Sequence, residues 1–254
     1  MAENEIDLNA LLDAQINSEE SVRKRELGHF WATDMGKCKR QVYYSFTNPK
    51  TFPPSKKRIF RTGIIMHDYI QKLLKGLEGA VFKEVWSEKY ISVTDTETDL
   101  IITGKIDTFI MPSEGAVPVI FEFKSENERS FAKRDEPAFH HKCQLTIYLR
   151  SQRLPFGYIV YINKTTMELH QMKVLYSESL FTSIMRHTRD IYWHLKNSKL
   201  PQKSAREKWQ CDYCPYQEDC KFNNNPALHN RLFPNKIADA VVPAVKEKEV
   251  TANG

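Results

Sequence analysis

The chain has 254 residues, of which 41% are hydrophobic and 27% are charged. This composition is ordinary for a globular protein and excludes a wholly disordered chain or a fibrous repeat. No apolar run reaches the roughly 20 residues that span a bilayer, and the first ten residues lack the basic-then-apolar order of a signal peptide. We therefore expect a cytoplasmic protein with no membrane partner. The net charge of +5 is too small to indicate nucleic acid by itself.

The length predicts one core with an appended lobe. Apolar residues recur at helical spacing within residues 5–27, which indicates a helix in an N-terminal segment that we bound at residues 1–30. Residues 37–61 then form a basic segment with eight Lys or Arg residues and no Asp or Glu. A second helix is predicted to begin at Ile64 and to end near Gly76. His67 is expected on or beside its buried face.

Strands and helices alternate through the rest of the core, which we place at residues 31–200. We expect strands at 81–93, 100–111 and 117–124, a helix at 139–152, two strands at 157–163 and 168–175, and a long helix at 177–197. A turn cluster at residues 112–115 predicts an antiparallel hairpin between the second and third strands. This order predicts an α/β fold with a central mixed sheet flanked by helices. Residues 201–232 form the appended lobe, and residues 233–254 are predicted to be a disordered tail.

The basic segment interleaves its cations with aromatic residues. Cations that follow a phosphate backbone and aromatics that stack on bases are typical of single-strand binding. We therefore expect DNA contacts from Lys56, Lys57, Arg58 and Arg61. The alternative is that the aromatics belong to the core and that the lysines are merely solvated.

Acidic residues stand on both strands of the predicted hairpin. Glu122 and Lys124 are two apart on one strand, so their side chains project from the same face, and Asp107 can meet them from the other strand. Phosphodiester hydrolysis needs a hard cation held by carboxylates, with open positions for water and a phosphate oxygen. Lys124 can orient the attacking water, and His67 can add an imidazole ligand that tolerates manganese as well as magnesium. The plain alternative is a solvated strand face, but a buried strand has no stability reason to hold unpaired charges.

The four cysteines Cys38, Cys211, Cys214 and Cys220 are candidate metal ligands. A reducing compartment and an odd total of five cysteines argue against a disulfide framework. Four thiolates suit either zinc or an iron-sulfur cluster. The fifth, Cys143, lies in a predicted helix and is expected to be a small buried hydrophobe.

These motifs, in their order, resemble the RecB-type branch of the PD-(D/E)xK nucleases. The matching residues are His67, then Gly104-x-x-Asp107, then Glu122-x-Lys124, then Gln144-x-x-x-Tyr148. The resemblance implies a restriction-endonuclease-like core in which His67, Asp107, Glu122 and the Phe123 carbonyl bind Mg²⁺ or Mn²⁺. It also implies that Lys124 is catalytic and that Gln144 and Tyr148 contact DNA. Glu84 or Glu88 matches a further acidic position loosely.

The distant Cys38 and the C-terminal cysteine trio resemble the iron-sulfur nucleases, among which the CRISPR-associated RecB-like exonucleases fit best in size. This resemblance favours a 4Fe-4S cluster over Zn²⁺ in the C-terminal lobe. It implies a DNA exonuclease, acting on single strands from 5′ to 3′, that works with CRISPR integrase proteins in spacer acquisition or in DNA end processing. A viral or recombination exonuclease outside CRISPR would share every residue cited. The competing class is a DNA-binding adaptor that has lost its chemistry.

Overall fold

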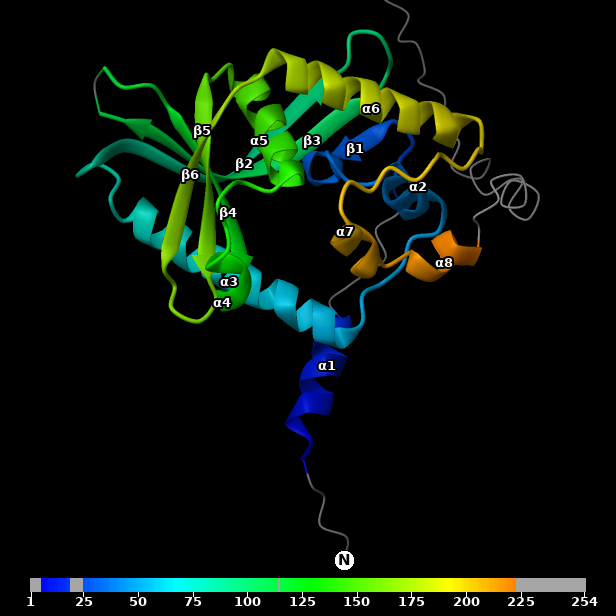
Figure 1. The fold of residues 1–254 in the computed structure, drawn as a ribbon. Coiled ribbons are helices and arrows are strands. Elements are labelled where there is room, and N and C mark those ends of the chain that lie inside the picture. Colours follow the sequence, from blue (N-terminus) through cyan, green and yellow to red (C-terminus); the bar gives the residue numbers. More distant parts are fainter. Residues whose placement is uncertain (1–5, 19–24, 114, 223–254) are drawn as a thin grey trace, which may run out of the picture.

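A computed structural model describes residues 6–18, 25–113 and 115–222, and its centre is a six-stranded mixed sheet with helices on both faces (Figure 1). The predicted sheet flanked by helices is thus confirmed. The predicted tail, residues 233–254, lies outside the described residues. Within the described residues, no helix is long and apolar enough to cross a membrane.

The strands follow the predicted positions closely. They are β1 (His29–Trp31), β2 (Phe82–Thr94), β3 (Ile101–Pro112), β4 (Val119–Glu126), β5 (Phe156–Asn163) and β6 (Leu169–Leu175). β2 pairs antiparallel with β3 along nearly its whole length, β4 runs parallel to β5, and β6 closes the far edge antiparallel to β5. The short β1 was not predicted from the sequence, because three residues carry too little periodicity to be noticed.

The sheet forks in the middle of β3. Since β2 occupies one edge of β3, both β1 and β4 must pair with the other edge, β1 at residues 101–103 and β4 at residues 108–110. The predicted hairpin of β3 and β4 is confirmed, but its ladder stops at the pair Thr108 and Phe121. Beyond that pair β4 continues alongside β5 alone. Residues 104–107 of β3 are therefore left without a strand neighbour on this edge, and the fork opens there.

Two layers of helices cover the sheet. On one face α5 (Phe139–Gln152) contacts β5 and the 3-10 helix η1 (Ala32–Asp34). α6 (Glu178–Lys196) packs on α5 and on α2 (Lys39–Thr47). On the other face α3 (Pro54–Lys75) packs Ile70 against Phe123 of β4 and Val160 of β5. The short α4 (Glu128–Phe131) follows β4. The alternation of side chains along β4 therefore turns Phe123 toward α3 and Glu122 and Lys124 toward α5.

Two helix boundaries differ from those predicted. α3 begins at Pro54, ten residues before the expected Ile64, with a proline in its first turn. A proline suits that position because its missing N–H has no partner there in any helix. α1 (Leu8–Ser18) is shorter than predicted, and it has no buried residue. It projects from the body in Figure 1, where Arg58 and Lys57 of α3 bind Asp13 and Asn17.

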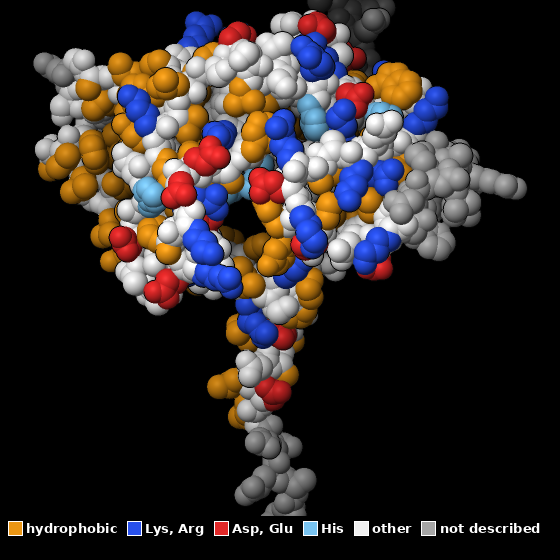
Figure 2. Space-filling view, viewed as in Figure 1, with side chains coloured by type: hydrophobic (Ala, Val, Ile, Leu, Met, Phe, Trp, Pro, Cys, Tyr) orange, Lys and Arg blue, Asp and Glu red, His pale blue; other side chains and the backbone are white. Residues whose placement is uncertain are grey.

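The C-terminal lobe contains α7 (Lys208–Asp212) and α8 (Gln217–Phe222). It lies against α2, where the rings of Tyr44 and Tyr216 are 5.5 Å apart and Asn48 Nδ2 donates to Asp219 Oδ1 at 3.2 Å. Segments more than 160 residues apart in the sequence thus touch. Figure 2 shows an opening in this face of the molecule, at the place that β4, α5, α7 and α3 surround in Figure 1.

Candidate active site

The fork brings two carboxylates together below α5. Asp107 Oδ2 accepts the backbone N–H of Phe123 at 2.7 Å, so this carboxylate satisfies a backbone group that the ended ladder leaves free. Glu122 is 1% exposed, and its Oε1 accepts hydrogen bonds at 2.6 Å from both Lys124 Nζ and Gln144 Nε2. Its second oxygen, Oε2, is buried and has no hydrogen-bond partner among the described residues. A buried oxygen of this kind is costly unless something polar or charged reaches it.

The carboxylates carry more negative charge than their surroundings compensate. Burial raises the pKa of Asp107 to about 6, against the opposing effect of Lys124. Burial, together with the nearby Asp107, raises the pKa of Glu122 to about 7. Burial by itself would lower the pKa of Lys124, but the two carboxylates outweigh it and raise the pKa. One ammonium thus faces two buried acids, and a divalent cation would offset the negative charge that the ammonium leaves uncompensated.

The helix on the opposite face supplies further polar groups. His67 of α3 lies with its Nδ1 3.7 Å from Asp107 Oδ2, and burial followed by the charge of Lys124 lowers its pKa. A neutral imidazole of this kind can ligate a metal. Gln71, one helical turn later, donates from Nε2 to the Asp107 carbonyl oxygen at 2.7 Å. The sequence analysis missed Gln71, whose four-residue spacing from His67 is the signal that could have found it.

Of the two loosely matched acids, only Glu88 lies at the site. Its backbone has φ 54°, a left-handed conformation that is uncommon for residues other than glycine. It stands opposite Asp107, between the register pairs formed by Ser87 and Lys89, and its Oε1 is 3.4 Å from Gln71 Nε2. Glu84 pairs in register with Met111, four residues farther along β3 from Asp107.

Gln144 and Tyr148 share the buried face of α5, as their spacing predicted. Gln144 Nε2 donates to Tyr148 Oη at 3.0 Å as well as to Glu122. Tyr148 in turn packs over Gly104, where an added Cβ would lie 2.8 Å from the tyrosine Cε1. The glycine of the Gly-x-x-Asp motif therefore makes room for this ring.

Two histidines that the sequence analysis did not select lie in the first turn of α5. His141 Nδ1 is 2.9 Å from Tyr161 Oη, and the His140 ring stands 4.0 Å from that of His141. Burial and then Lys124 lower the pKa of both, that of His140 to about 4. Their adjacency, three residues before Gln144, could have marked them.

The four predicted cysteine ligands line one cavity of about 200 Å³ between α2 and the C-terminal lobe. Ser204 N–H and Arg40 Nη1 each donate to a cysteine sulfur at 3.4 Å, to Cys38 and Cys220 respectively. Burial raises the pKa of Cys214, and the other three thiols of the cavity add to that rise. By its chemistry a set of four cysteines around one cavity suits zinc or an iron-sulfur cluster, although in the described part of the chain no three of them already form a metal-binding group. Cys143 is fully buried elsewhere, as expected.

The predicted basic contacts divide in two. Lys57 and Arg58 hold α1 through Asn17 and Asp13, whereas Lys56 Nζ lies 3.5 Å from the Tyr213 carbonyl oxygen of the C-terminal lobe. Arg61 follows one turn after Arg58 on α3.

Nowhere in the described part of the chain do three His, Cys, Asp or Glu side chains already stand as a preformed metal-binding group.

Comparison with known proteins identifies the family. A model of the PD-(D/E)XK nuclease superfamily matches residues 18–221. The chain belongs to this superfamily. Nucleases of the superfamily use divalent metal ions, which agrees with the charge balance of the fork. The RecB-like resemblance drawn from the motifs is confirmed.

The chain is also similar to individual proteins. It is 26% identical over 201 residues to the CRISPR-associated exonuclease Cas4 of Saccharolobus solfataricus. The matched region covers 77% of this chain and 89% of that protein. The crystal structure of SSO0001 has the same fold, with a TM-score of 0.61 at 22% identity over 85% of this chain and 96% of the other. The alkaline exonuclease LHK-Exo from Laribacter hongkongensis gives a TM-score of 0.47 at 12% identity over 68% of this chain and 90% of the other.

Proposed function

We propose that this nuclease is a DNA exonuclease that hydrolyses phosphodiester bonds of single strands in the presence of Mg²⁺ or Mn²⁺. Its metal would be held at the fork by Asp107, Glu122, His67 and the Phe123 carbonyl. The observation that carries this proposal is the unpartnered Glu122 Oε2, buried beside a second carboxylate of raised pKa. Without a cation, burying that oxygen with no hydrogen-bond partner would cost folding free energy.

The side chains around the fork divide the chemistry. When bound, a divalent cation supplies Lewis acidity toward the phosphate oxygens and lowers the pKa of water. Lys124, fixed by its 2.6 Å bond to Glu122, can orient the attacking water and stabilise charge on the phosphate. Gln144 holds the Glu122 oxygen in place while Tyr148 supports Gln144. Cleavage then leaves a 5′ phosphate on the product.

The opening beside β4 supports access by a single strand. It exposes acidic and basic side chains together, as Figure 2 shows. Contacts to the strand are proposed for Gln144 and Tyr148 at the fork and for Lys56, Lys57, Arg58 and Arg61 on α3. We also propose 5′ to 3′ polarity.

Cleavage of end-labelled strands tests the activity and its direction. Wild-type protein should shorten a 3′-labelled strand progressively with Mg²⁺ or Mn²⁺, and it should be inert with EDTA. Asp107→Asn and Glu122→Gln should abolish cleavage, and Lys124→Ala should reduce it by about a hundredfold or more, the usual effect of losing an electrostatic stabiliser. Glu84→Gln, on the neighbouring strand, is the matched control and should keep full activity. Full activity of Asp107→Asn would refute the site, and an inactive wild type would favour the DNA-binding adaptor.

We further propose a 4Fe-4S cluster on Cys38, Cys211, Cys214 and Cys220, with Zn²⁺ as the alternative. Their shared cavity and the N–H donors to two of the sulfurs support it. Because Cys38 and the other three are more than 170 residues apart, ligation would convert binding energy into folding energy. Anaerobically purified protein should be brown and contain iron. Cys38→Ser should bleach it and lower its melting temperature, while Cys143→Ser should leave the colour unchanged. A colourless zinc protein would refute the iron-sulfur assignment.

A role in CRISPR spacer acquisition is proposed from the similarity to the CRISPR-associated relative. The expected partner is a CRISPR integrase, and the alternative is a viral or recombination exonuclease that works alone. Co-purification of the tagged chain with an integrase from the same source would support the role in CRISPR spacer acquisition. If the two proteins do not associate and the enzyme degrades strands alone, a viral or recombination exonuclease is favoured.

A further inference from the structure

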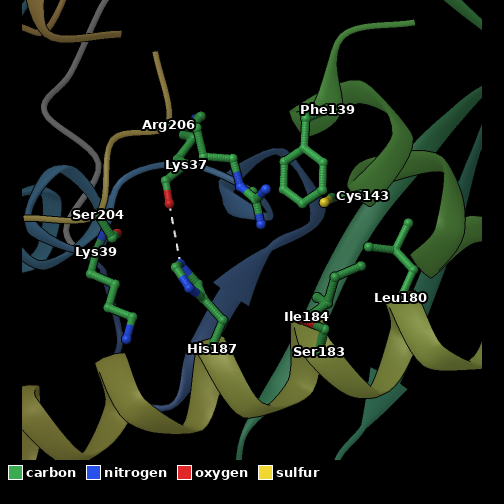
Figure 3. A pocket seen from close by; sticks show the side chains of 11 residues that line it. Lys37, Lys39, Phe139, Cys143, Leu180, Ser183, Ile184, His187, Ser204 and Arg206 are labelled. Atoms are coloured by element: carbon green, nitrogen blue, oxygen red, sulfur yellow. Dashed lines mark hydrogen bonds between the residues drawn. The ribbon is translucent and has the colours of Figure 1, made fainter. Parts of the chain in front are cut away.

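A second cavity, of about 250 Å³, is lined in part by Phe139 and Cys143 of α5, whereas Gln144 of the same helix reaches Glu122 at the fork. Figure 3 shows its lining residues, which come from the segment just before α2 and the first residue of α2, from α5, from α6 and from the loop after α6. Three are cations, namely Lys37, Lys39 and Arg206, and none of the lining residues is acidic. His140, next to the lining Phe139, is close enough to both Lys124 and Lys37 that each lowers its pKa, after burial. The cavity is thus a neighbour of the active site without sharing its carboxylates.

Arg206 is the least compensated of the three cations. Its guanidinium stacks on the Phe139 ring at 3.7 Å, and within the described residues no carboxylate pairs with it. Lys39 is paired with the partly exposed Asp190 at 2.8 Å, and Lys37 stands 3.7 Å from Asp34. The Lys39 pair is partly exposed and contributes little, so Lys39 can turn toward another anion at small cost. The Asp34 carboxylate beside Lys37 is buried, but it is also paired with Arg25. The planar guanidinium is the side chain best suited to hold two oxygens of one phosphate.

The walls of the cavity differ in character. Ser204 Oγ accepts the Lys39 N–H at 2.9 Å, which leaves its own hydroxyl hydrogen for an acceptor in the cavity. His187 Nε2 is 3.1 Å from the Lys37 carbonyl oxygen, the hydrogen bond drawn in Figure 3. The opposite wall is apolar, formed by Phe139, Leu180 and Ile184. A ligand that fits both walls carries a phosphate at one end and a flat or apolar group at the other.

We propose that this cavity binds a nucleotide phosphate, with Arg206 as its main ligand and Phe139 beside the base or sugar. The volume is at the small end for ligand pockets, which suits about one nucleotide and excludes a longer stretch of strand. The nucleotide can be a free mononucleotide or one unit of a bound DNA strand. The alternative is that the three cations are merely solvated and form no specific site. In that case the affinity for a nucleotide would not exceed that of general charge attraction.

Calorimetric titration of the full chain without divalent metal tests this proposal independently of cleavage. The probes are dAMP, inorganic phosphate and 2′-deoxyadenosine. Wild-type protein should bind dAMP more tightly than phosphate, and it should not bind the uncharged nucleoside measurably. Arg206→Gln should weaken dAMP binding by about tenfold or more, the effect of removing a charge-assisted hydrogen bond. The matched control, Arg186→Gln, removes an exposed charge from α6 outside the cavity and should change nothing.

A second arm separates the two sources of the phosphate. If the cavity holds a unit of the strand, Arg206→Gln should weaken binding of a short single-stranded oligonucleotide by the same factor as dAMP, and dAMP should compete with that strand. If it holds a free nucleotide, strand binding should be unaffected. The proposal is overturned if dAMP binds Arg206→Gln as tightly as wild type, or if Glu122→Gln abolishes dAMP binding, which would place the ligand at the fork. Melting curves of each variant verify that it is folded.

Discussion

Gly104→Ala should damage the active site from a position that touches no substrate. The new Cβ would lie 2.8 Å from Tyr148 Cε1 and 2.9 Å from its Oη, closer than real Cβ atoms approach a neighbour, and a tight 3.0 Å from Ala32 Cβ. Tyr148 is 1% exposed, so its ring has little room to withdraw. Overpacking of this kind costs about 1 to 3 kcal/mol of unfolding free energy. The displaced ring would also pull on Gln144, which donates to Glu122. A displacement of about 1 Å at a catalytic group can lower the rate by about a hundredfold.

Urea denaturation and cleavage rates should be measured together on this variant. Gly157→Ala is the matched control, because its Cβ would meet Ile120 O and two leucine methyl groups at 3.2 Å without touching Tyr148 or Gln144. It should lose stability and keep activity. Tyr148→Leu removes the clashing ring, so the double variant with Gly104→Ala should lose less stability than the two single losses added together. Additive losses, or a Gly104→Ala protein as stable and active as wild type, would refute the proposed packing.

Three further outcomes are expected. In the metal-free protein the pKa of Asp107 is raised from 3.8 to about 6 and that of Glu122 from 4.5 to about 7, so the folded chain binds these protons more tightly than the unfolded chain does. The melting temperature should therefore fall as the pH rises from the ordinary pKa values through the raised ones, and added Mn²⁺ should reverse the fall. A melting temperature that rises over this range would contradict the charge balance. Glu88→Gln should weaken metal-dependent cleavage while Glu84→Gln does not, and equal rates would remove Glu88 from the site. Lys56→Gln should reduce the slope of log affinity for single strands against log salt by about 0.7, and an unchanged slope would show that this lysine is merely solvated.

The sequence predicted the elements whose apolar periodicity is strong. The helix at residues 139–152 has the predicted bounds, and β3 and β4 form the expected hairpin. The start of α3 was missed because Ile59, Phe60, Ile64 and Ile65 are all at least 49% exposed, so no buried stripe marks the first half of that helix. α1 has no buried face at all. The apolar spacing still predicted a helix in this segment, so in α1 the periodicity does not report burial.

For the candidate site, the sequence named residues by type, but it did not predict how they are arranged. A carboxylate and a lysine two apart on a strand indicate a shared face, and the structure places Glu122 and Lys124 in that way. The fork was not predictable, because it depends on where β4 leaves β3 for β5, which is a tertiary choice of register. Gln71 reaches the Asp107 carbonyl oxygen from α3, and Glu88 stands opposite Asp107 through the pairing of β2 with β3. From the sequence Glu88 was named only as a loose match, and a glutamine four residues after a histidine is too common a pattern to select Gln71 by itself.

Binding of Mn²⁺ to the purified protein tests the central claim most directly. Calorimetric titration at neutral pH should give a saturable site in wild type, with proton release on binding, because Glu122, whose pKa is raised to about 7, must lose the proton that it still partly carries. Glu122→Gln keeps the shape of the side chain and its contact with Gln144, so it should fold and yet lose that site, while Glu84→Gln should retain it. Undiminished Mn²⁺ affinity in folded Glu122→Gln would contradict the account.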